Sequence, residues 1–204
     1  MNKKDLLIDG KKSNQNYFIL AHGAGAPMDS DWMNQIVEKL VQKDITVVRF
    51  EFPYMNERRH NGKKRPPNTK KVLLQTWMDA ITLFKDKNLY IGGKSMGGRM
   101  ATLLEDLSMV KGIICLGFPF HAPGKEPNDR IAHLEDFKKK TLILQGTRDS
   151  MGNKEEVLQY NLSKKIKIHW LEDGDHSLKP RVKSGHTLDQ HLDEAVKEIQ
   201  KFIK

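Results

Sequence analysis

The sequence has 204 residues, of which 38% are hydrophobic, and it carries a formal net charge of +9 at pH 7. This length is sufficient to bury a hydrophobic core, and we expect one domain, residues 1–204. The longest apolar stretch, 112–118, is too short to cross a bilayer, and the N-terminus lacks the apolar segment of a signal peptide, so we expect a cytoplasmic protein.

In the first half of the chain, apolar runs of strand length alternate with segments of helical periodicity. The first dozen residues can add an antiparallel edge strand. The segment 17–21 is a predicted strand, and 31–42 is a predicted helix because its apolar residues recur at spacings of three and four. A strand at 45–50, a long basic loop and a helix at 69–85 follow.

The second half continues this alternation. We expect helices at 96–107, 154–161 and 188–202, and strands at 89–92, 112–118, 141–145 and 166–171. The segment 112–118 hardly alternates between apolar and polar residues, which is typical of a strand that is buried on both faces. Regular alternation of strands and helices favours βαβ units. The predicted fold is therefore α/β, a three-layer α/β/α sandwich with a mostly parallel sheet.

Four glycines surround Ser95 where a predicted strand gives way to a predicted helix. The segment 93–97 fits G-x-S-x-G, the nucleophile elbow, in which a tight turn lifts the serine hydroxyl clear of the sheet. A phosphate-binding loop would need glycine where Asn88 stands. A dinucleotide-binding loop at 23–28 would need its third glycine where Met28 stands. The elbow is therefore the preferred interpretation.

A serine nucleophile needs a base, and the base needs an acid that orients it. In α/β hydrolases the acid and then the histidine follow the serine along the chain. Asp149 follows the strand 141–145, and His176 follows the strand 166–171, so both should lie at the same sheet edge as Ser95. Ser95, Asp149 and His176 are the predicted catalytic triad, with Asp173 and Asp175 as rivals for the acid.

Two backbone amides should stabilise the oxyanion that forms when the serine attacks. Met96 begins the helix after the elbow, so its amide can point at developing negative charge. The second amide should come from the small-residue turn after the strand 17–21, where Ala24 is our first choice and Gly25 our second. His22 opens this turn, as a structural anchor for the loop or as a residue beside the substrate.

These motifs together resemble the α/β-hydrolase superfamily, and in particular its small dienelactone-hydrolase-like branch of predicted hydrolases. The resemblance covers nearly the full chain, and it includes the elbow, the H-G-A-G-A turn, Q-G-T-R-D and W-L-E-D-G-D-H. It implies an eight-stranded, mostly parallel sheet, shortened in a chain of this size. The gap 121–140 is too short for a lid domain, so we expect an open site that takes short esters, thioesters or lactones.

The basic loop after the strand 45–50 should open on the same edge as Ser95. Arg58 or Arg59 is expected to hold an anionic group of a small-molecule substrate, because arginine binds carboxylates with two parallel hydrogen bonds. The same charge suits an alternative function, a non-catalytic scaffold that binds a protein partner or nucleic acid. No aromatic residues are interleaved with the charges, which disfavours nucleic acid. We expect no cofactor and no metal site, because a single cysteine and scattered carboxylates offer no ligand cluster.

Overall fold

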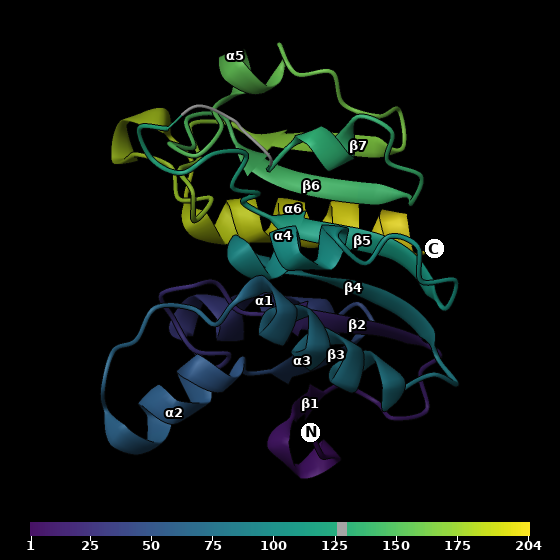
Figure 1. The fold of residues 1–204 in the computed structure, drawn as a ribbon. Helices are drawn as coiled ribbons and strands as arrows, with labels where there is room; N and C mark the ends of the chain where they lie inside the picture. The colour runs from purple at the N-terminus through teal and green to yellow at the C-terminus, as the bar shows by residue number, and fades with distance from the viewer. Residues whose placement is uncertain (126–129) are drawn as a thin grey trace.

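The computed structural model describes residues 1–125 and 130–204, and its centre is a seven-stranded sheet in the order β1-β3-β2-β4-β5-β6-β7 (Figure 1). The first strand is antiparallel to β3, and every other neighbouring pair is parallel. The strands are β1 (Leu7–Asp9), β2 (Asn16–Ala21), β3 (Thr46–Phe50), β4 (Asn88–Lys94), β5 (Val110–Leu116), β6 (Thr141–Gly146) and β7 (Ile166–Leu171). The predicted edge strand is present, and the sheet has one strand fewer than the resemblance implied.

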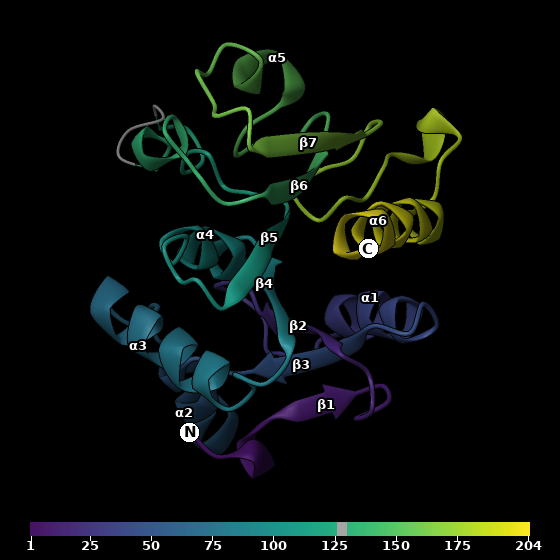
Figure 2. The ribbon, with the colours of Figure 1, turned by 90° about the vertical axis from the view of Figure 1, so that its right-hand side faces the viewer.

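Helices cover both faces of the sheet and make it the middle of three layers (Figure 2). One face packs α1 (Asp31–Val41) and α6 (Leu188–Ile203) into a core that includes Ile36 and Leu192. The other face packs α2 (Pro53–Asn61), α3 (Lys70–Thr82) and α4 (Met96–Thr102) into a core that includes Trp77 and Met100. Residues 112–116 of β5 are buried, as the apolar run 112–118 predicts, and residues 17–21 of β2 are buried as well.

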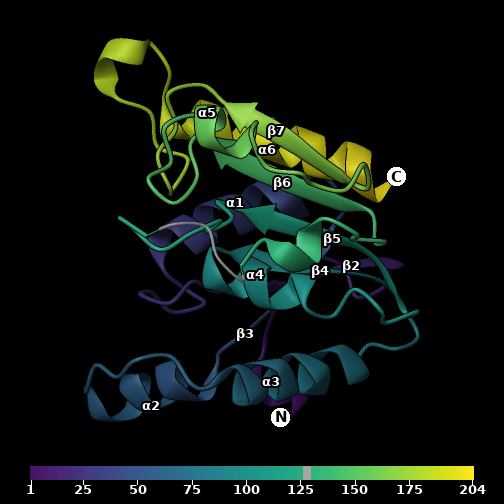
Figure 3. The ribbon, with the colours of Figure 1, turned by 45° about the horizontal axis from the view of Figure 1, so that its top comes forward.

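The segment that we expected to be a long basic loop contains a helix. Pro53 occupies the first turn of α2, where the missing proline amide costs no hydrogen bond, and Gly62 ends the helix with φ 71°. A proline near the start and a glycine just after the end are ordinary helix boundaries, but the helix has few apolar residues and therefore little periodicity. Figure 3 shows α2 and α3 following one another along one side of the sheet.

The other predicted helices are present with different ends. The helix expected at 96–107 ends at Thr102, and the one expected at 154–161 is a single turn, α5 (Lys154–Val157). Three short 3-10 turns complete the described elements: η1 (Lys3–Asp5), η2 (Ala132–Leu134) and η3 (Val182–Ser184). In the described part of the connection from β5 to β6, η2 is the only regular element, so no lid domain covers the sheet there.

The parallel strands bring distant parts of the chain to one edge of the sheet. Residue pairs across the central strands are in register, with Ala21 opposite Gly93 and Gly93 opposite Cys115. The loops that follow β2, β4, β6 and β7 therefore start at the same edge. Within the described residues, no helix has the length and apolar character needed to cross a membrane.

Candidate active site

Ser95 lies on the sharp turn between β4 and α4, with φ 50° and ψ −117°, a conformation that non-glycine residues seldom adopt. The turn brings backbones too close for side chains. A Cβ atom added to Gly93 would lie 2.4 Å from the carbonyl oxygen of Ala21, and one added to Gly97 would lie 2.6 Å from that of His22. The two glycines of the motif are therefore required by sterics, as the sequence pattern indicates.

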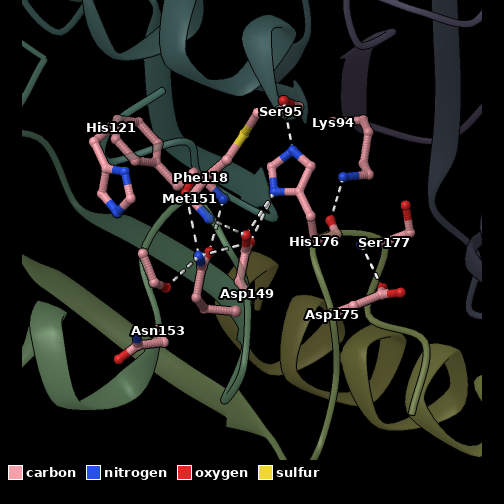
Figure 4. Close-up of polar contacts among 12 residues, drawn as sticks. Lys94, Ser95, Phe118, His121, Asp149, Met151, Asn153, Asp175, His176 and Ser177 are labelled. Carbon is pink, nitrogen blue, oxygen red and sulfur yellow. Dashed lines mark hydrogen bonds and ion pairs between the residues drawn. The ribbon is translucent and has the colours of Figure 1, made fainter. Parts of the chain in front are cut away.

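Ser95, His176 and Asp149 form one hydrogen-bonded chain across the edge of the sheet (Figure 4). The Oγ of Ser95 is 2.8 Å from Nε2 of His176, and Nδ1 of His176 is 2.8 Å from Oδ2 of Asp149. Because Nδ1 faces a carboxylate, it carries the proton, which leaves Nε2 free to accept one from the serine hydroxyl. The structure thus brings together the three residues that the sequence singled out.

The carboxylate of Asp149 is fully buried and receives further hydrogen bonds. The amide of Met151 donates to Oδ1 at 2.8 Å, and Nε2 of Gln145 donates to Oδ2 at 2.9 Å. The buried Gln145 side chain also bonds the backbone of Phe118 at both its amide and its carbonyl, and the carbonyl of Gly152. Sequence reasoning missed Gln145, although a lone glutamine at the end of an apolar strand is the pattern that could have indicated it.

The two rival carboxylates have other partners. Arg181 donates through Nε to Oδ1 of Asp173 at 2.8 Å, and this pairing holds the pKa of Asp173 well below its usual range. The carboxylate of Asp175 accepts the amides of Ser177 and Lys179, which closes the turn that presents His176. Both residues therefore shape the loop after β7, and Asp149 is the carboxylate beside the imidazole.

Of the predicted oxyanion donors, Met96 directly follows Ser95, and Ala24 and Gly25 line a cavity together with Ser95. Within the described ranges, no backbone hydrogen bond occupies the amides of Met96, Ala24 or Gly25. The carbonyl oxygens of Ala24 and Gly25, in the same turn, accept hydrogen bonds from side chains of α2. Tyr54 donates to the oxygen of Ala24 at 3.0 Å, and Arg58 donates to the oxygen of Gly25 at 3.1 Å. Helix α2 thus fixes the orientation of these peptide groups.

His22 is fully buried and does not reach a substrate cavity. Its Nε2 accepts the amide of Phe52 at 3.1 Å, and its Nδ1 donates to the carbonyl of Gly23 at 2.6 Å. Burial lowers the pKa of His22, so the ring is neutral and its two nitrogens are both engaged. The anchor interpretation of His22 fits these contacts, and its expected role beside the substrate does not.

Arg59 is not available to a ligand, contrary to our expectation. Its guanidinium donates to both carboxylate oxygens of Glu51, at 2.5 and 3.0 Å, and to both of Asp29, at 2.7 and 3.0 Å. These two carboxylates raise the pKa of Arg59. Arg58 donates from Nη1 to the carbonyl of Gly25 and forms no ion pair within the described residues, so the pairing with carboxylates applies to Arg59 alone.

A cavity of about 330 Å³ opens beside Ser95 and His176, with Trp32 and Lys94 in its wall. Lys94 directly precedes Ser95, and its ammonium donates a hydrogen bond to the carbonyl of His176 (Figure 4). The same ammonium lies 5.7 Å from the centre of the Trp32 ring. Burial lowers the pKa of Lys94 to about 8, although the charges of Asp149 and Asp175 act in the opposite direction. Lys94 therefore ties the elbow to the histidine loop.

Comparisons with known proteins agree with this fold. Residues 14–204 match the family described as Alpha/beta hydrolase domain. The structure is similar to Est1E from Butyrivibrio proteoclasticus with ferulic acid bound, at 16% identity and a TM-score of 0.70, over 97% of this chain and 93% of that chain. A monoacylglycerol lipase from Paleococcus ferrophilus is 14% identical with a TM-score of 0.68, over 97% of both chains.

A serine hydrolase without a lid from Xanthomonas campestris is 15% identical with a TM-score of 0.63, over 95% of this chain and 88% of that chain. At such identities the structures show a shared fold and leave the substrate open. The match to the family itself extends over nearly the whole sequence and includes β2 to α6. The chain therefore belongs to the α/β-hydrolase family.

Proposed function

We infer that this protein is a serine hydrolase that cleaves a small ester-like bond, in a carboxylester, thioester or lactone, through an acyl-enzyme. The observation that supports this most directly is the continuous hydrogen-bonded chain from Ser95 through His176 to Asp149, at 2.8 Å for each link. The monoacylglycerol lipase, which is named for an ester substrate, and Est1E, which has ferulic acid bound, have similar folds. Carboxylesterase chemistry of the small dienelactone-hydrolase-like kind is the activity that we propose.

The reaction uses the three side chains in two half-reactions. The hydroxyl of Ser95 attacks the substrate carbonyl while Nε2 of His176 takes its proton, and Asp149 stabilises the imidazolium that forms. The amides of Met96 and Ala24 donate to the oxyanion. His176 then protonates the leaving oxygen or sulfur, so that the bond to it breaks. A water molecule, activated by the same histidine, hydrolyses the acyl-enzyme.

The size of the site favours small substrates. The cavity beside His176 has a volume of about 330 Å³, and a second cavity that reaches Ser95 has a volume of about 290 Å³. Ser95, Ala24 and Met151 line both cavities, so the nucleophile stands between them. Two small cavities that meet at one serine suit an ester with a short group on each side of the scissile bond.

A fluorophosphonate probe tests the nucleophile. We expect it to label the wild-type protein on Ser95, and we expect Ser95→Ala to remove both the labelling and the turnover of short acyl esters, thioesters and lactones. Peptide mapping by mass spectrometry identifies the labelled residue. Labelling of Ser95→Ala at the wild-type rate would contradict this function.

A further inference from the structure

The second cavity beside Ser95 is lined by positive charge. Its wall contains Lys70 from α3, Arg99 from α4, and Arg130 from the connection between β5 and β6. Among the described residues, no aspartate or glutamate lines it. This cavity differs from an ordinary surface, where cations and acids are mixed. Its like charges repel one another, and an anionic ligand would offset that repulsion.

These three cations have no partners of their own in the described structure. No ion pair or side-chain hydrogen bond from Lys70, Arg99 or Arg130 is present within residues 1–125 and 130–204. The Arg99 guanidinium is half-buried, so its charge is only partly hydrated. A charge that is partly withdrawn from water is more stable with a partner, and Arg99 has none among the described residues.

The electrostatic environment of the cluster is repulsive. Burial lowers the pKa of Arg99, and the nearby charge of Arg130 lowers it further. Burial, Arg99 and Lys70 together lower the pKa of His133, whose Nε2 lies 2.9 Å from the hydroxyl of Thr102. The first turn of α3 contains no acidic residue, so the positive end of the helix dipole adds to the same field. An anion in the cavity would relieve this repulsion.

The position of His176 indicates which part of the substrate enters this cavity. His176 must protonate the leaving group, and it lines the first cavity but not the second. Met96, the oxyanion donor, lines the second cavity. The leaving alcohol or thiol therefore occupies the first cavity, and the acyl chain extends from Ser95 toward the cations.

We propose that the natural substrate has an acyl chain that ends in a carboxylate, and that Arg99, assisted by Arg130 and Lys70, binds this carboxylate. The substrate class is a half-ester of a short dicarboxylic acid. Ser95 takes the acyl group while the alcohol leaves with the proton from His176, and water then hydrolyses the acyl-enzyme, so that the products are the alcohol, the dicarboxylate and one proton. This proposal rests on the proposed function, and it moves the anion site from the expected Arg58 and Arg59 to the start of α4.

Monoethyl esters of succinic, glutaric and adipic acid test the proposal. Each is compared with the ethyl ester in which a carboxamide replaces the free carboxylate. This amide ester is uncharged but has the same length and the same leaving group, and ethanol release is measured for both. We expect the wild-type ratio of kcat/KM, half-ester over amide ester, to be about 10 to 100 for the best chain length. Arg99→Gln should lower this ratio about tenfold or more, and added salt should lower it in the wild type.

Two further variants make the test specific. Arg130→Gln should also lower the ratio, and it serves if circular dichroism shows that Arg99→Gln does not fold. Lys71→Gln is the matched control, since Lys71 is adjacent to Lys70 in α3 but does not line the cavity, and its ratio should equal that of the wild type.

The possible failures are distinguishable. A wild-type ratio near or below one, with Ser95 labelled by the fluorophosphonate and the amide esters hydrolysed, would overturn the carboxylate proposal alone. A ratio unchanged in both folded arginine variants would do the same. Absence of both labelling and turnover would overturn the proposed function together with this inference.

Discussion

Two groups of arginines near the active-site edge are treated in opposite ways by the fold. On α2, Arg59 is bonded to two carboxylates and Arg58 to the carbonyl of Gly25. Beside α4, Arg99 and Arg130 line a cavity and have no partner among the described residues. The α2 arginines form a dense basic run in the sequence, whereas Arg99 and Arg130 are 31 positions apart.

The difference teaches that a basic run in a sequence does not locate an anion site. What matters is which charges remain unpaired after folding, because a paired guanidinium has already used the donors that a ligand would need. Glu51 has a side chain that is only 3% exposed, so its pairing with Arg59 is part of the structure. The arginines that remain available to an anionic ligand are those without a carboxylate nearby, Arg99 and Arg130.

The largest expected difference between the two groups is in stability. Arg59→Gln leaves the buried carboxylate of Glu51 without a cation, and we expect the free energy of unfolding to fall by about 2–3 kcal/mol. Arg99→Gln removes an unpaired charge, and we expect a change of at most about 0.5 kcal/mol. Urea denaturation followed by circular dichroism measures both.

The stability difference between wild type and Arg59→Gln should depend on pH. Arg59 lowers the pKa of Asp29, so the folded state binds this proton more weakly than the unfolded state does. The stabilisation is present at neutral pH and is lost as the pH falls below the ordinary aspartate value of about 4. The difference between wild type and Arg59→Gln should therefore narrow at low pH. Equal losses of stability for Arg59→Gln and Arg99→Gln at pH 7 would remove the contrast between the groups.

Lys94 is an intermediate case, a partly buried cation that donates to the carbonyl of His176 and forms no ion pair among the described residues. Its pKa is lowered to about 8, so between pH 8 and the ordinary lysine value of about 10.5 the unfolded state binds more protons than the folded state. Stability from this group therefore increases with pH in that window. We expect the wild type to gain on the order of 1–3 kcal/mol relative to Lys94→Met between about pH 7.5 and 10.

Paired urea denaturation curves of the two proteins at each pH isolate this effect, because the other lysines and tyrosines titrate in both. A difference between wild type and Lys94→Met that stays constant across the window would show that the ammonium of Lys94 is well solvated, as an exposed lysine is.

The smallest expected effect concerns Arg58. Arg58→Gln removes the hydrogen bond to the carbonyl of Gly25, which loosens the turn that bears the Ala24 amide. We expect kcat/KM to fall about two- to tenfold, equally for charged and uncharged esters, because only the oxyanion donor is disturbed. Steady-state kinetics with matched substrates measure this. Arg65→Gln is the control, since Arg65 forms an exposed pair with Glu57.

A change in the ratio of charged to uncharged substrates in Arg58→Gln would reverse the comparison. It would mean that α2 holds the substrate anion, as the sequence first suggested, and that the cavity beside α4 does not.

Much of the framework could be predicted from the sequence because its signals are local. The apolar strands, the G-x-S-x-G turn and the polar residues after β6 and β7 each depend on a few neighbouring positions. Since parallel strands end at one edge, Ser95, Asp149 and His176 could be expected to meet there, and the structure has them within hydrogen-bonding distance. Their catalytic roles remain proposals that the experiments above test.

The rest depends on contacts between residues that are far apart in the chain. The pairing of Arg59 with Asp29 spans 30 positions, and that of Gln145 with Phe118 spans 27. Neither has a periodic pattern. Helix α2 was missed for a different reason, because its polar sequence gives no apolar stripe and only Pro53 and Gly62 mark its ends. The opposite error occurs at α5, where the sequence pattern predicts a helix over 154–161 and the structure has a single helical turn.

The strand β5 contributes no side chain to the proposed triad, but it separates the strands that precede Ser95 and Asp149. The amide of Ser95 donates to the carbonyl of Leu116, the last residue of β5, and the side chain of Gln145, in β6, bonds the backbone of Phe118, two residues after the end of β5. The proposed nucleophile and acid therefore follow β4 and β6, two strands that are separated by β5 and so by two strand spacings, roughly 9–10 Å. One imidazole with a hydrogen bond at each end spans most of this distance. The spacing between strands therefore sets the separation over which His176 would transfer a proton.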